Sequence, residues 1–141
     1  MLDFDTDFFN NNNGYVHIPR TELFIQTKLS FIQNSEYDVY QKMIYMLLHT
    51  YGIDYRGVYP THLRIATQLK ISKRKVITVL NELEDVGGIY IVNRKYKGTN
   101  QKISNLYYLA EISKDGFFIR ESLDIVKERY PDKVVELDKP Y

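Results

Sequence analysis

The chain has no cysteine, no tryptophan and only four prolines among its 141 residues. Without cysteine it can form no disulfide, thiolate metal ligand or cysteine nucleophile. It also lacks a run of about 18 apolar residues, so we expect no membrane-spanning helix and no membrane partner. The first residues are acidic where a secretory signal would be basic, which predicts a cytoplasmic protein.

Positive charge is concentrated in one block of the sequence. The formal net charge is only +1, yet residues 61–102 hold nine Lys or Arg against three Asp or Glu. Residues 1–14 have a formal net charge of −3, and their apolar residues do not recur at helical or strand spacing. We therefore interpret them as a flexible acidic arm. A basic block in a nearly neutral chain is where an anionic partner would bind.

The first of three predicted helices starts at Ser35, a candidate N-cap with Asp38 three residues on, and ends at Gly52. At 3.6 residues per turn, one face gathers apolar residues, which predicts a buried stripe. The predicted stripe is Tyr40, Met43, Ile44, Leu47, Leu48 and Tyr51, with Asp38, Lys42, Tyr45 and His49 opposite.

Two shorter helices follow, separated by a tight turn at Lys70 and Ile71. Thr61 is placed to cap the first of them and Ser72 the second, because hydroxyl side chains accept bonds from the free N–H groups of a first helical turn. Their predicted core residues are Ile65, Ala66 and Leu69 in one, and Val76, Val79, Leu80, Leu83 and Val86 in the other. Gly87 and Gly88 end the second.

A β-hairpin and a last helix complete the predicted order. Residues 89–96 and 103–109 are rich in Ile, Val and Tyr and flank a polar, basic tip, which predicts two paired strands. In 119–130, Ile119, Leu123, Val126 and Tyr130 recur at helical spacing until Pro131. That stripe can fold back on the first helix or pair with a second copy of the chain.

Several short motifs in this order resemble the helix-turn-helix of winged-helix replication proteins from plasmids and phages of Gram-positive bacteria. They are Pro60-Thr61, Ile65-Ala66, Leu69-Lys70-Ile71-Ser72, Val76, Leu83-Glu84 and Gly87, and Ser104-Asn105-Leu106-Tyr107-Tyr108-Leu109, similar to a motif that closes the wing. The resemblance spans about residues 15–110. Lys70 stands where a turn glycine is usual, and Gly88 replaces the usual leucine.

The resemblance implies an α+β protein: a winged helix-turn-helix with a three-helix core and a hairpin wing. The domains are then an acidic arm (1–14), the winged helix (15–112) and a C-terminal amphipathic helix and tail (113–141). It also implies binding to double-stranded DNA in replication initiation or maintenance of a plasmid, phage or mobile element, often as a homodimer and with other replication proteins as partners.

The third helix argues for DNA independently, because its charges oppose its own dipole. Basic residues open it and acidic residues close it, and each such exposed charge costs about 0.3–1 kcal/mol. A recognition helix entering the major groove would account for this order. Arg74, Thr78 and Asn81 would then read base edges. Ser72, Lys73 and Lys75 would contact phosphates. The alternative is an ordinary solvated helix.

The wing supplies a second set of cations, namely Arg94, Lys95, Lys97 and Lys102. They would contact the phosphate backbone or the minor groove, unless the hairpin is merely a basic surface. No catalytic motif, cofactor-binding loop or metal-ligand spacing is present, so we expect neither an enzyme nor a metal or cofactor site. Two alternatives stay open: a transcriptional regulator, or a winged helix that binds proteins.

Overall fold

The computed structural model describes residues 26–52, 57–99 and 101–138. The predicted acidic arm lies outside these residues. The helices are α2 (Leu29–Ile32), α3 (Val39–His49), α4 (His62–Leu69), α5 (Lys73–Asp85) and α6 (Asp124–Arg129), the last preceded by a 3-10 turn at Arg120–Leu123. The strands are β1 (Ile89–Tyr96), β2 (Lys102–Leu109), β3 (Glu111–Ile112), β4 (Phe118–Ile119) and β5 (Val134–Leu137). The protein is therefore of the α+β class.

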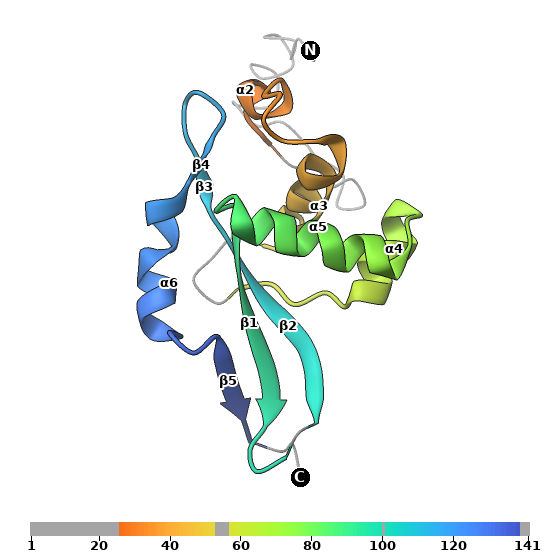
Figure 1. Ribbon diagram of the computed structural model, residues 1–141, viewed down its shortest axis with the longest axis vertical. Coiled ribbons are helices and arrows are strands. Elements are labelled where there is room, and N and C mark those ends of the chain that lie inside the picture. The colour runs from red at the N-terminus through yellow and green to blue at the C-terminus, as the bar shows by residue number, and fades with distance from the viewer. Residues whose placement is uncertain (1–25, 53–56, 100, 139–141) are drawn as a thin grey trace, which may run out of the picture.

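Helices α2, α3, α4 and α5 gather at one end, and the long hairpin of β1 and β2 extends away from them (Figure 1). In the same view α4 lies on one side of the hairpin and α6 on the other, while β5 runs beside β1. The three-stranded sheet has the order β2-β1-β5, antiparallel between β1 and β2 and parallel between β1 and β5. Val58, before α4, adds an antiparallel bridge to Tyr107 on β2.

One apolar core joins these elements. Its largest fully buried side chains come from α2, α3, α4, α5, the sheet and the segment before α6: Phe31, Ile44, Leu48, Ile65, Val76, Val79, Leu80, Leu83, Ile89, Val92, Tyr107 and Leu123. Burying such side chains contributes about 1.5–3 kcal/mol each. In the predicted stripe of α5, Val76, Val79, Leu80 and Leu83 are all buried as expected. The fifth residue, Val86, follows the helix as its C-cap and is partly buried against the core.

The ends of α4 and α5 also match the prediction. The Thr61 hydroxyl accepts from the N–H of Arg64, and the Ser72 hydroxyl accepts from the N–H of Lys75 at 3.0 Å. At the end of α5, the N–H of Gly88 donates to the carbonyl of Leu83 at 2.8 Å, and Gly87 has φ +78°. This is a left-handed C-terminal cap, a conformation that favours glycine. Between the helices, Lys70 has φ +55°.

Gly88, the second departure from the resembling family, has a packing reason. A Cβ at this position would lie 2.6 Å from the ring of Phe118, closer than carbon atoms can approach without displacement. The ring belongs to β4, in the two-stranded sheet with β3 that follows the hairpin. Glycine therefore lets the start of β1 pass directly against this sheet.

Helix α3 begins later than predicted and is rotated. Its N-cap is Asp38, not Ser35, because Gln41 reaches back to the N–H of Asp38 while its own N–H bonds the Asp38 carboxylate at 2.8 Å. Tyr45, expected to face solvent, is buried, whereas Tyr40 and Met43, expected in the core, are 41% and 42% exposed.

Partners from distant elements explain the rotation. The Tyr45 hydroxyl donates to the carbonyl of Ala110, and its ring packs on Phe31 and Phe118, with centroids 5.4 and 4.9 Å away. Burial, with the nearby charge of Glu111, raises the pKa of Tyr45, so the phenol stays protonated and keeps donating. Neither α2 nor β4 was predicted, so the sequence pattern could not show these contacts.

The C-terminal helix is shorter than predicted. Ile119 belongs to β4, and only Asp124–Arg129 is α-helical. The Ser122 hydroxyl accepts from the N–H of Glu111 and donates to the carbonyl of Ile119, which holds this segment against β3. Leu123 and Val126 are buried within the chain, so these two residues of the predicted dimer stripe are already packed.

Candidate nucleic-acid interface

The start of α5 presents its cations to solvent. Lys73 and Arg74 are exposed, and neither side chain forms an ion pair or hydrogen bond within the described part of the chain. Lys75 is half-buried, with its ammonium 4.3 Å from the centre of the exposed Tyr40 ring. The Ser72 oxygen accepts from the backbone of α5, which leaves its hydroxyl hydrogen free to donate outward.

The remaining predicted base-reading residues share this outward face. Thr78 and Asn81 are exposed, and they follow Arg74 at helical spacing, so the three side chains form one line along α5. Asp85 is exposed at the far end of the same line. The structure therefore brings together the α5 residues that the sequence predicted as a set.

The acidic end of α5 serves the fold. The Glu82 carboxylate accepts from the Gln41 side chain at 3.2 Å. The Glu84 carboxylate accepts from the N–H of Ile91 at 2.7 Å and pairs with the Lys133 ammonium at 2.5 Å. Intramolecular bonds thus account for Glu82 and Glu84, whereas the two exposed cations at the start of α5 have no ion-pair or hydrogen-bond partner in the described residues.

Three of the four predicted wing cations have partners within the chain. The Arg94 guanidinium donates to the Ser104 carbonyl and hydroxyl, both at 2.7 Å, and lies 4.7 Å from the centre of the Tyr59 ring. Lys95 pairs with Glu136 at 3.6 Å and Lys97 with Asp138 at 3.5 Å. The Lys102 side chain lies outside the described residues. Against expectation, Arg94 holds the hairpin together and the two lysines face carboxylates.

A polar notch of about 190 Å³ separates α5 from the hairpin. Its lining combines amide, imidazole and charged side chains with apolar ones: His62, Ile77, Leu80, Asn81, Glu84, Ile91, Asn93, Asn105 and Lys133. Burial, and secondarily the charge of Lys73, lower the pKa of His62. His62 is therefore neutral near pH 7 and adds hydrogen-bonding capacity to the notch without adding charge.

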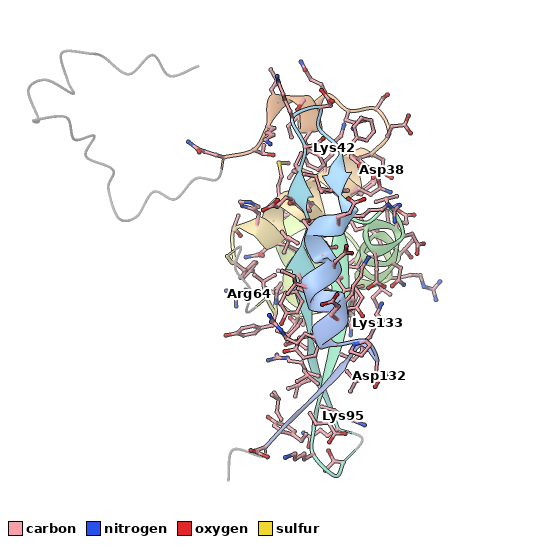
Figure 2. All side chains as sticks on the ribbon, turned by 90° about the vertical axis from the view of Figure 1, so that its left-hand side faces the viewer. Asp38, Lys42, Arg64, Lys95, Asp132 and Lys133 are labelled. Atoms are coloured by element: carbon pink, nitrogen blue, oxygen red, sulfur yellow. The ribbon has the colours of Figure 1, made fainter. Side chains whose placement is uncertain are left out.

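Figure 2 shows which labelled side chains lie on the α5 side of the molecule. Asp132 and Lys133 lie toward the side occupied by α5, and Arg64 lies on the opposite side. Arg64 is 5.7 Å from the centre of the Tyr51 ring. It therefore lies on the side of α4 that faces away from α5.

The sequence pattern did not predict the carboxylates that pair with two of the predicted wing lysines. Glu136 and Asp138 come from β5 and its flank, about 40 residues after the lysines they meet. The run Val134-Val135-Glu136-Leu137 has some strand character, and this was the only available signal. Tyr59 and Tyr40 were missed because their cationic partners lie on other elements.

Within the described residues we also looked for a metal site, a membrane-spanning helix and a cavity. No group of three or more metal-ligating side chains occurs there, and no helix has the length and apolarity needed to cross a bilayer. A cavity of about 1260 Å³ lies between α3, β2 and α6. No protein-family model, curated protein or solved structure matches the chain.

Proposed function

We propose that the protein is a winged helix-turn-helix protein that binds double-stranded DNA, with α5 as its recognition helix and the β1–β2 hairpin as its wing. The order α3, α4, tight turn, α5 and hairpin supports this fold assignment, as does the bridge from Val58 to β2, which extends the wing sheet toward α4. The left-handed Lys70 occupies the turn position where glycine is usual in the resembling proteins.

The observation that carries the proposal is the open, basic start of α5. Lys73 and Arg74 stand at the positive end of the helix dipole, exposed and without a compensating carboxylate in the described residues. Each such charge costs the free protein about 0.3–1 kcal/mol. Contact with a phosphate backbone would repay that cost, because neutralising phosphates releases condensed counterions.

The exposed polar residues Arg74, Thr78 and Asn81 on α5 each have a chemically suited contact. Arg74 can donate two bonds to guanine, Asn81 can pair with adenine, and the Thr78 methyl can touch the methyl of thymine. Ser72 and Lys73 would donate to phosphates. Lys75 would do so from its position over Tyr40, which limits the rotamers it must give up on binding.

The biological role follows from the resemblance: replication initiation or maintenance of a plasmid, phage or mobile element. A transcriptional regulator would use the same surface in the same way. The second candidate, a winged helix that binds proteins, is favoured by one observation, the carboxylates that already occupy Lys95 and Lys97, since they reduce the charge offered to DNA.

Duplex binding measured against salt concentration tests the proposal. Several phosphate contacts predict a fall of log affinity with log salt of slope about −0.9 per contact. Arg74→Ala should weaken binding to the preferred duplex by about 5- to 150-fold and relax selectivity at one base position. The matched control is Lys127→Ala on α6, which removes an exposed cation away from α5 and should leave affinity nearly unchanged. A flat salt dependence, or equal effects of both variants, would favour the protein-binding candidate.

A further inference from the structure

The β5 segment sets carboxylates against the lysines of the wing. In the parallel pairing of β1 with β5, Lys95 lies opposite Glu136, and the ammonium and carboxylate are 3.6 Å apart. Two residues on, the Lys97 ammonium is 3.5 Å from the Asp138 carboxylate. The two acids therefore repeat the spacing of the two lysines along the same edge of the hairpin.

Main-chain bonds and one ion pair hold this segment in place. The N–H of Asn93 donates to the carbonyl of Lys133 and the N–H of Lys97 to that of Leu137, both at 2.8 Å. Lys133 also pairs with Glu84 on α5, so the segment runs from the recognition helix to the tip of the wing. In β5 Val134 and Glu136 are exposed and Val135 and Leu137 only half-buried. Such a short, solvated element opens more easily than the core.

From this arrangement we infer that β5 is an autoinhibitory strap: Glu136 and Asp138 occupy the wing lysines, and phosphates must displace them. The inference rests on the proposed DNA binding. It adds that the affinity of the free chain is set below what its lysines would allow, by an element that follows the winged helix in the chain.

The weakness of the two ion pairs is what makes the competition reversible. The Lys97 and Asp138 side chains are 66% and 86% exposed, and those of Lys95 and Glu136 37% and 47%. Exposed pairs of this kind stabilise little. A row of phosphates can therefore displace the carboxylates, although the displaced acids still stand beside the DNA and repel it.

Charge-neutral replacement of the two acids tests the inference. We compare Glu136→Gln/Asp138→Asn with Asp124→Asn/Glu128→Gln, which makes the same two chemical changes on exposed positions of α6. Both double variants raise the net charge by two, so a general gain in attraction cancels. The β5 variant should bind duplex DNA about 2- to 30-fold more tightly than the α6 variant at low salt, the range that two exposed ion pairs span. Its salt slope should be steeper by up to about 1.8, for two more phosphate contacts.

Lys97→Ala supplies a second measurement that a general change in charge would not produce. It should weaken duplex binding more in the Glu136→Gln/Asp138→Asn background than in the unchanged chain, because only there is Lys97 free for phosphate. Equal affinities of the β5 and α6 variants overturn the strap, and so do equal effects of Lys97→Ala in the two backgrounds. The proposed function fails on a different result, namely an unchanged affinity of Arg74→Ala, so the two failures are distinguishable.

Discussion

The start of α5 and the edge of the β1–β2 hairpin are both basic in sequence, but only the start of α5 has cations without intramolecular partners in the described residues. Lys73 and Arg74 are exposed without an intramolecular partner in the described residues, whereas Lys95 and Lys97 face carboxylates and Arg94 is bonded to Ser104. The comparison teaches that a count of cations does not measure the charge available to a ligand. Availability depends on which acids the fold brings alongside.

Among variants that test this difference between the hairpin and α5, we expect the largest effect on stability from Arg94→Ala. Loss of two charge-assisted bonds to Ser104 and of the contact with Tyr59 should lower the free energy of unfolding by about 1–2 kcal/mol. Duplex affinity should change little. Arg74→Ala should do the reverse: it should weaken binding and raise the free energy of unfolding by about 0.3–1 kcal/mol, because it removes a cation from the positive end of the α5 dipole. Urea unfolding and duplex titration of both variants check this. Strong loss of binding by Arg94→Ala at unchanged stability would show that the guanidinium contacts DNA.

A smaller effect is expected at the turn that presents α5. Lys70 holds a left-handed conformation, which costs an L-residue about 1–2 kcal/mol. Lys70→Gly relieves this but gains unfolded-state entropy, so we expect a net stabilisation of about 0.5–1 kcal/mol, seen as a higher melting temperature. Lys70→Asn should fall between the two, since asparagine tolerates this region better than lysine. A destabilised glycine variant would mean that the Lys70 side chain itself contributes to the fold.

The smallest effect concerns His62, in the notch between the two regions. Burial and the charge of Lys73 lower its pKa in the folded chain, so the unfolded chain binds its proton at higher pH. The stability this provides is fully present above the ordinary histidine pKa of about 6.5 and is lost as pH falls through the lower, folded value.

His62→Gln should therefore reduce the acid sensitivity of stability below about pH 6.5, measured by thermal unfolding across pH. His49, whose pKa burial also lowers, remains in that variant and keeps part of the dependence. In Lys73→Ala an NMR titration should show the pKa of His62 rising toward its ordinary value. No change in either measurement would place His62 in water and away from Lys73.

Much of the α4-to-β2 region was predictable because its signals are local. Thr61, Ser72 and Gly87 act within a turn of their own helix ends, and the apolar spacing of α5 matches its buried face. The prediction failed where a residue's partner is distant. Tyr45 is buried because Ala110 accepts its hydroxyl, and the predicted last helix is shortened because Ile119 pairs with β3.

Helix periodicity and capping depend only on residues that are near neighbours in the sequence. The order of amino acids was therefore enough to locate the central helices and the hairpin, and to show which side chains of α5 point away from the core. Tertiary structure alone decided which of the cations are open. Ion pairs form between residues that are close in space, whatever their distance in the sequence. Because β5 pairs with β1, Glu136 and Asp138 lie beside the lysines of the hairpin, while the start of α5 has no such acids beside it in the described residues.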